Sequence, residues 1–154
     1  MMKRFMIVLG LLIFVLTLFG FPKVAVARVK PWTGSRGWGL DAPYCCLYSI
    51  KTMETVEGIV VTVQRFIPRR GMSAGVHLLV RVGIDIVDVH LGPEWYLENQ
   101  DITIQPKDQV EVKGSKVSFR GQSAIIAAEV RKGDDILRMR DENGFPAWIA
   151  WRRR

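Results

Sequence analysis

The sequence has little cysteine. Among its 154 residues there are two, Cys45 and Cys46, and they are adjacent. One pair cannot frame a disulfide scaffold, and neighbouring cysteines form a strained bridge at best. The Cys-x-x-Cys-His motif is absent, which excludes covalently attached haem of that type. Two interpretations stay open: the thiols are buried or unused, or they bind a soft metal ion or another chain.

The short motifs of common enzyme classes are also missing. The chain has no His-Glu-x-x-His helix and no phosphate-binding glycine loop. The Gly-x-Ser-x-Gly spacing occurs at Gly71–Gly75, but in a loop that leads into the strand expected at Val76–Val82 and not in a strand-to-helix elbow. Asp85, Asp88 and Glu94 could be interpreted as a carboxylate cluster, but acids on a hairpin and at a helix start are ordinary on a surface. We therefore predict that the protein is not an enzyme.

Positive charge is scarce in the middle of the chain. The whole sequence has a formal charge of +7, yet Thr52–Val130 contains 8 Lys/Arg and 10 Asp/Glu. A site for nucleic acid needs a basic groove and aromatic platforms on the strands. Phe66 and Phe119 are the only aromatic residues on the strands expected there. Nucleic-acid binding is therefore not expected.

The N-terminus is typical of an export signal. Met1–Arg4 is basic, Phe5–Phe21 is apolar, and Ala25–Ala27 offers a small-x-small cleavage site. The apolar run just reaches the roughly 17 residues that a membrane-spanning helix needs. The chain is thus either released after Ala27 or held by one N-terminal membrane helix. In both cases we expect the rest of the protein in the periplasm or an equivalent lumen.

The segment 28–51 is predicted to be an irregular arm. Prolines and glycines deny it regular structure, while Trp32, Trp38 and Tyr44 give it aromatic groups with which to dock.

The stretch Thr55–Phe66 is predicted to be the central strand, because β-branched residues dominate it. Its apolar alternation includes Val56, Gly58 and Val60, then breaks and resumes at Val63. A slip of one residue is typical of a β-bulge, and glycine allows a sharp bend. A long first strand that bends to serve two sheets is typical of a small closed barrel, with Val60 in its core.

The next two strands are predicted at Val76–Val82 and Asp85–Leu91, joined by a tight turn at Gly83-Ile84. This turn sets a register in which one face is wholly apolar and the other brings two histidines together. The expected pairs are Val76 with Leu91, His77 with His90, Leu78 with Val89, Leu79 with Asp88, and Val80 with Val87.

A short helix should follow Pro93, and two more strands should follow the helix. The fourth strand contains Val110–Phe119. The fifth is Ser123–Val130, with an inward face of Ala124, Ile126, Ala128 and Val130. The predicted fold is all-β, a five-stranded OB-like barrel with a short helix between strands three and four. The predicted organisation is an N-terminal hydrophobic helix (1–27), the arm (28–51), the barrel (52–130) and a C-terminal β-hairpin with a basic tail (131–154).

Several segments carry a resemblance: Val56-x-Gly58-x-Val60, the run His90–Leu97, the stretch from Pro106 to Gly114, and the ending DENGFPAWIAWRRR. They resemble the periplasmic bacterial OB-fold family of stress-response type, which implies binding of a cation or small ligand. More loosely, the layout is similar to MamS-type magnetosome proteins, which implies membrane association and a role in magnetite crystal growth.

His77 and His90 are the candidate metal ligands. Opposed residues on paired strands have Cβ atoms about 4.5–5.5 Å apart, so two imidazoles can share one ion. Met72 precedes them and would suit copper(I); periplasmic copper-chaperone barrels are similar, although the Met-x-Met pair of that group is absent. The expected cofactor is a copper or iron ion. Alternatively, the histidines only cover the outer face or hydrogen-bond a carboxylate such as Asp88.

The first functional prediction is an exported or membrane-associated adaptor, with metal handling as the alternative. An adaptor needs a contact surface for a protein partner or an anionic membrane, which tryptophan and arginine side chains suit. The candidate contact residues are Arg69, Arg70, Trp148, Trp151, Arg152, Arg153 and Arg154.

Overall fold

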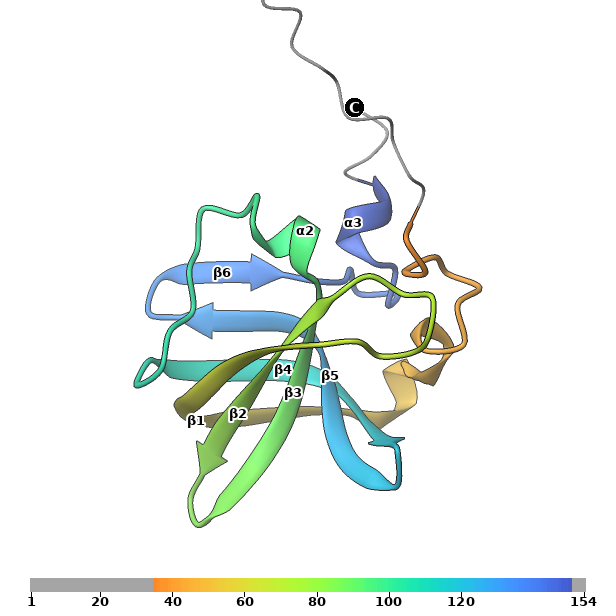
Figure 1. Cartoon of the computed structure of the whole chain (residues 1–154). Helices are drawn as coiled ribbons and strands as arrows, with labels where there is room; N and C mark the ends of the chain where they lie inside the picture. The colour runs from red at the N-terminus through yellow and green to blue at the C-terminus, as the bar shows by residue number, and fades with distance from the viewer. Residues whose placement is uncertain (1–34, 151–154) are drawn as a thin grey trace, which may run out of the picture. The chain divides into compact units, whose positions relative to one another are not determined.

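Five strands close into a barrel in the computed structural model, which describes residues 35–150 (Figure 1). Neighbouring strands pair antiparallel in the order β3-β2-β1-β4-β5, and a parallel pair between β3 and β5 closes the barrel. This connectivity is OB-like, as predicted. The strands are β1 (Met53–Phe66), β2 (Gly75–Val82), β3 (Asp85–Pro93), β4 (Gln109–Phe119) and β5 (Gln122–Lys132), with helix α2 (Glu94–Leu97) between β3 and β4.

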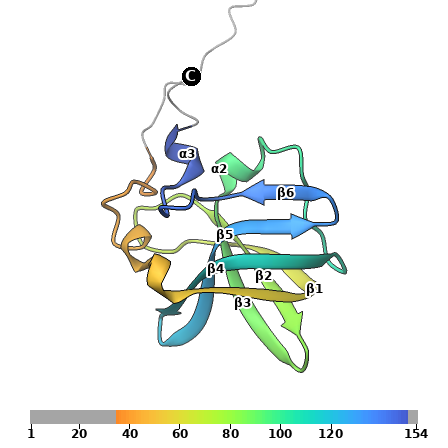
Figure 2. The same cartoon turned by 180° about the vertical axis from the view of Figure 1, so that it is seen from behind.

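Strand β1 bends and serves both sides of the barrel, which confirms the prediction made from its broken alternation. Its first half pairs with β4 and its second half with β2 (Figure 2). A register shift lies between Val60 and Thr62. Gly58 is required for a different reason from the one expected: a Cβ atom there would lie 2.2 Å from the carbonyl oxygen of Arg81. The backbones of β1 and β2 could not approach so closely around any other residue.

The β2–β3 hairpin has the predicted register along most of its length. His77 pairs with His90, and Leu78 with Val89. Gly83 adopts a positive φ of 61° in the turn, which glycine permits at no steric cost. The prediction is wrong at the far end, where Val76 pairs with Gly92 instead of Leu91 because the register shifts between Val76 and His77.

Strand β5 contains a bulge that the sequence did not reveal. Ala127 pairs with Gly114 and Glu129 with Lys113, so Ala128 is the extra residue. The bulge reverses the alternation before it. Ala124 and Ile126 therefore lie on the outer face, not in the barrel interior as expected. They are buried nonetheless, because other segments cover that face.

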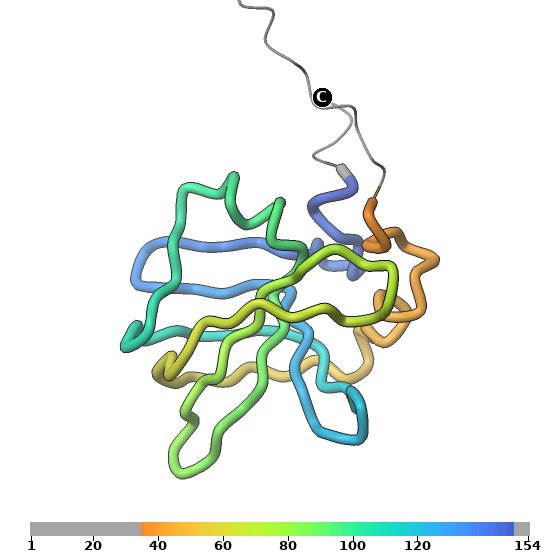
Figure 3. The backbone as a smooth tube through the Cα atoms, viewed as in Figure 1, coloured from red at the N-terminus to blue at the C-terminus, as the bar shows by residue number. Residues whose placement is uncertain are grey.

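The cover is provided by the arm, which is the described segment 35–52, and by the C-terminal segment. The arm contains two short 3₁₀ helices, η1 (Cys45–Leu47) and η2 (Ile50–Thr52). It lies beside the C-terminal end of the described chain (Figure 3). The indole nitrogen of Trp148 donates to the carbonyl of Trp38 at 3.0 Å, and the two rings meet edge to face.

The C-terminal β-hairpin prediction is wrong. Strand β6 (Asp135–Arg138) is present, but it extends the sheet beside β5. The returning chain makes one bridge, between Arg140 and Pro146, and then forms helix α3 (Ala147–Ala150). The Asp141 carboxylate accepts the backbone N–H groups of Asn143 and Phe145, which stabilises a turn instead of a ladder.

Several predictions fall outside the described residues: the apolar run Phe5–Phe21, cleavage after Ala27, and the tail residues Trp151, Arg152, Arg153 and Arg154. Within residues 35–150, no helix is both long and apolar enough to cross a membrane.

Substitutions of Val60, which is 1% exposed, test whether β1 contributes to the core of the barrel. Val60→Ala should cost about 1–3 kcal/mol of unfolding free energy, the range for losing part of a core side chain. Val60→Asp should prevent folding, because it places an unpaired charge in the core. Urea denaturation followed by circular dichroism measures both.

The matched control is Ile59→Asp, because Ile59 is the adjacent residue and is 49% exposed. This variant should remain folded. A Val60→Asp protein that unfolds at the same urea concentration as Ile59→Asp would contradict the placement of β1.

Candidate metal centre

Three side chains with metal-ligating atoms meet on the outer face of the β2–β3 hairpin. His77 lies on β2, directly opposite His90 on β3. Asp88 precedes His90 by two residues, so the two side chains project from the same face of the strand. Candidate ligating atoms of the three residues all lie within 4.8 Å of one another.

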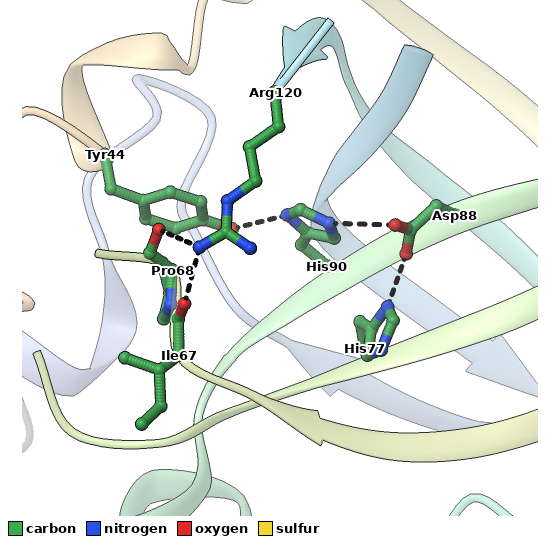
Figure 4. Close-up of polar contacts among 7 residues, drawn as sticks. All are labelled: Tyr44, Ile67, Pro68, His77, Asp88, His90 and Arg120. Carbon is green, nitrogen blue, oxygen red and sulfur yellow. Dashed lines mark hydrogen bonds and ion pairs between the residues drawn. The ribbon is translucent and has the colours of Figure 1, made fainter. Parts of the chain in front are cut away.

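The Asp88 carboxylate joins the two imidazoles (Figure 4). Its Oδ1 lies 2.6 Å from Nδ1 of His77, and its Oδ2 lies 3.3 Å from Nε2 of His90. Burial alone would raise the pKa of Asp88, but the hydrogen bonds from His90 and His77 outweigh it and hold the pKa below its usual value. The carboxylate is therefore ionised at neutral pH and is ready to accept a cation.

Aromatic rings enclose His90, whose side chain is 1% exposed. The centroids of Phe66 and Phe119 lie 4.6 and 4.8 Å from the imidazole centroid, and the ring of Tyr44 stacks on it at 5.9 Å. The enclosure is incomplete on one side, where Asp88 is 30% exposed and His77 is 15% exposed. An ion in solution can thus reach the cluster past these two residues.

Tyr44 fixes the orientation of the buried imidazole. Its hydroxyl oxygen lies 2.8 Å from Nδ1 of His90, on the side opposite to Asp88. Burial raises the pKa of the Tyr44 phenol far above its ordinary value, so the hydroxyl keeps its proton. The hydroxyl donates to Nδ1 when Nε2 carries the proton, and it accepts from Nδ1–H when Nε2 is free to bind a ligand. This contact keeps Nε2 directed at Asp88 in either case.

Arg120 closes the same region from the β4–β5 turn. Its Nη2 donates to the carbonyl oxygens of Ile67 and Pro68 at 3.0 and 3.1 Å, and its guanidinium lies 5.0 Å from the centroid of the Phe119 ring. The β4–β5 turn is thereby tied to the β1–β2 loop (Figure 4). OB barrels bind ligands on the face of strands two and three between these two loops, which is where the cluster lies.

Two imidazoles and one carboxylate suit a divalent transition-metal ion. This donor set holds iron(II) in non-haem oxygenases, and a similar set of two histidines and one carboxylate holds zinc in some proteases. Thiolate and thioether ligands, which soft copper(I) prefers, do not contribute to it. The cluster therefore has the donors and the opening that a site for a borderline divalent ion requires.

The structure brings two of the three predicted ligands together. His77 and His90 lie together, but Met72 packs against Gly37 of the arm, and no described contact joins it to either histidine. Asp88 was expected only as an alternative hydrogen-bonding partner. Its spacing of two from His90 on a strand is the signal that could have assigned it as a ligand.

The predicted contact residues differ in their exposure. Arg69 and Arg70 are exposed in the β1–β2 loop. Trp148 is fully buried against Trp38, so the prediction that it contacts a partner or a membrane is wrong. The thiols are free, with Cys45 buried and Cys46 exposed.

The fold and the cluster together define an OB-like β-barrel with a candidate metal centre on the face of β2 and β3. The sequence profile of the MamS/MamX magnetosome protein family matches residues 52–137, more than half of the chain, and the chain belongs to this family. The resemblance to magnetosome proteins is thereby confirmed, and the resemblance to stress-response proteins stays a prediction.

No curated protein matches the chain. Among solved structures, the chain is similar to one in the "Crystal structure of S. pombe Stn1-ten1 complex", with a TM-score of 0.40 and 20% sequence identity. This match covers 66% of the present chain and 67% of the other.

Because Tyr44 hydrogen-bonds the buried His90, removing its hydroxyl should lower the free energy of unfolding even when no metal is bound. Tyr44→Phe keeps the ring but leaves Nδ1 of the buried His90 without its partner, which should cost about 1–3 kcal/mol. Chemical denaturation in the presence of a chelator measures this cost. Tyr48→Phe is the matched control, because the Tyr48 hydroxyl donates to the sulfur of Met53, which is a weak acceptor. An equal effect of both changes would contradict the positioning role of Tyr44.

Proposed function

We propose that this chain is a non-enzymatic magnetosome protein that binds one divalent transition-metal ion through His77, Asp88 and His90. The observation that carries the proposal is the convergence of the three ligating side chains within 4.8 Å on the ligand-binding face of an OB-like barrel. Membership of the MamS/MamX magnetosome family supports iron(II) as the physiological ion, because magnetosomes contain the iron mineral magnetite.

The ion would be held by Nδ1 of His77, Nε2 of His90 and one or both oxygens of Asp88. These are the atoms that hydrogen-bond one another in the structure. Binding therefore replaces the protons between them, and affinity should fall in acid because protons compete for the same atoms. Nδ1–H of His90 would then donate to the Tyr44 hydroxyl, which fixes the ring and increases the basicity of Nε2.

Three protein ligands leave coordination positions free on the exposed side, next to Asp88 and His77. A bound ion could exchange there with water, with a carrier or with a growing mineral surface. This openness favours metal handling, meaning capture and delivery of an ion, over a closed structural site. We further propose that residues 1–27 direct the protein across the membrane, so that the site faces the lumen.

Metal titration of the purified full-length protein tests the proposal. Calorimetry with iron(II), zinc(II) and copper(II) should show one ion per chain, with iron(II) the weakest of the three by the Irving–Williams order. His77→Ala, His90→Ala and Asp88→Asn should each weaken binding by more than about 10–100-fold, the cost of losing a residue that only orients a ligand. His77 and His90 are the only histidines in the chain, so no other imidazole can substitute for them.

Two matched controls separate ligands from their neighbours. Asp85→Asn removes an exposed carboxylate from the same strand and should leave the affinity unchanged. Met72→Leu should also leave it unchanged, because Met72 packs against the arm. Failure of the parent protein to take up one ion, or equal affinity in Asp88→Asn and Asp85→Asn, would contradict metal binding at this cluster. The adaptor function, with Arg69 and Arg70 as its exposed contact residues, would then remain.

A further inference from the structure

One edge of strand β1 is unpaired near the end of the strand. The first half of β1 pairs with β4 and the second half with β2. On the side away from β2, the N–H of Val60 donates to the carbonyl of Asp108, and the carbonyl of Val60 accepts from the N–H of Lys107. Beyond Val60, no backbone hydrogen bond joins this side of β1 to another described residue. The edge over residues 62–66 is therefore without a strand partner in the part of the chain that the structure describes.

The turn between β2 and β3 determines which backbone groups of β1 lie on this edge. A two-residue turn leaves the residues beside it, here Val82 and Asp85, as a hydrogen-bonded pair, and every second residue along β2 repeats the pattern. The N–H and C=O of Leu78 therefore point at β3 and away from β1. The partner of Leu78 on β1 is Val63, so the N–H and C=O of Val63 point away from β2. The same holds for Arg65, which is two residues further along β1.

A hollow of about 350 Å³ lies against this edge. It extends from β1 to helix α2, to the segment after α2 and to Leu137 of β6 (Figure 1). Most of the side chains that line it are apolar, among them Val63, Val76, Leu91, Leu97, Ile102 and Ile104. Val63 is 38% exposed, so the hollow is open to solvent along the edge of β1. An apolar hollow of this volume is at the lower end of the range for ligand sites.

The charged residues that line the hollow are one arginine and two glutamates. Glu94 forms an ion pair with Arg65, so these two charges compensate each other. Glu98 is exposed and has no ion-pair partner among the residues that the structure describes. The rim of the hollow is therefore negative, and a basic side chain is its electrostatic complement.

We propose that this edge binds an extended peptide segment of a partner protein, which adds to β1 as a further strand. Val63 and Arg65 supply the backbone hydrogen bonds, and the hollow receives alternate apolar side chains of the peptide, with a basic residue near Glu98. An exposed strand edge is a template for pairing with another chain. A hydrocarbon chain also suits an apolar hollow, but it offers no donor or acceptor to the strand edge.

The site is separate from the histidine cluster. Val63 and Gln64 are successive residues of β1, so their side chains lie on opposite faces of the sheet. Gln64 pairs with His77, which places the cluster on the face opposite to the hollow. Peptide binding therefore does not depend on metal binding.

The probe is the peptide Lys-Val-Thr-Val-Thr-Val-Lys with blocked ends, titrated into ¹⁵N-labelled full-length protein in the presence of a chelator. The backbone amide resonances of Val63 and Arg65 should shift in a saturable way, because their N–H groups acquire an acceptor. A second peptide carries N-methyl groups on its valines and threonines. It keeps the same side chains but loses the central backbone donors, so it should not bind in a saturable way.

Val63→Pro removes an N–H from the edge and should weaken binding of the unmethylated peptide by about 10-fold or more in calorimetry. Proline is tolerated where the N–H of an edge strand faces solvent, so this variant should fold. Ile86→Pro is the matched control. Ile86 pairs with Arg81 next to the turn, its N–H also points away from β2, and it is 52% exposed. Ile86→Pro should bind the peptide like the parent protein.

Equal binding of the two peptides overturns strand addition, because the hollow would then only accept apolar side chains. This comparison needs the parent protein alone and holds whether or not a proline variant folds. Amide resonances of Val63 and Arg65 that do not shift, or equal binding by Val63→Pro and Ile86→Pro, overturn the site itself. His77→Ala should bind the peptide like the parent protein, so failure here is distinguishable from failure of metal binding.

Discussion

The contact between the arm and the outer face of β3, β4 and β5 determines most of what is distinctive in this structure. An OB-like barrel normally presents its outer face to solvent or to a ligand. Here Trp38, Tyr44 and Cys45 cover part of that face and are buried by it. The arm supplies the ring that stacks on His90 and the hydroxyl that orients it. The proposed metal centre lies where this second layer meets the barrel.

The electrostatics of the proposed metal centre depend on Asp88. In the histidine cluster, two imidazoles hydrogen-bond the Asp88 carboxylate and hold it ionised. The cluster combines these polar groups with a rigid surround of strands and rings, which limits reorganisation on binding. Away from this cluster, the Arg140 guanidinium lies between the rings of Tyr48 and Trp148.

Much of the barrel could be predicted from the sequence, because its signals are local. The broken alternation in Thr55–Phe66 revealed the bulge in β1, and the Gly83 turn set a register that brought His77 opposite His90. The bulge at Ala128 was not predictable, since the run Ala124–Ala128 is apolar throughout and offers no change of polarity to mark it. The prediction of a C-terminal hairpin failed because the side chain of Asp141 stabilises a turn. The alternation of apolar and polar residues does not indicate this turn.

The sites were predictable only in part. Pairing of the histidines follows from strand register, but cover of the outer face by the arm depends on contacts distant in sequence, such as Trp148 with Trp38. For the same reason Trp148 was assigned to the surface when it is buried. Arg140 gave no sequence signal, because an arginine near the C-terminus resembles any solvated charge until its burial is known.

X-ray absorption spectroscopy of the iron(II)-loaded protein tests the central claim most directly. The account predicts a first coordination shell of nitrogen and oxygen only, with the multiple-scattering signature of two imidazoles. In His77→Ala the signature should correspond to one imidazole. A first shell that contains sulfur, or a spectrum of the parent protein without imidazole, would place the ion away from His77, Asp88 and His90 and would contradict the account.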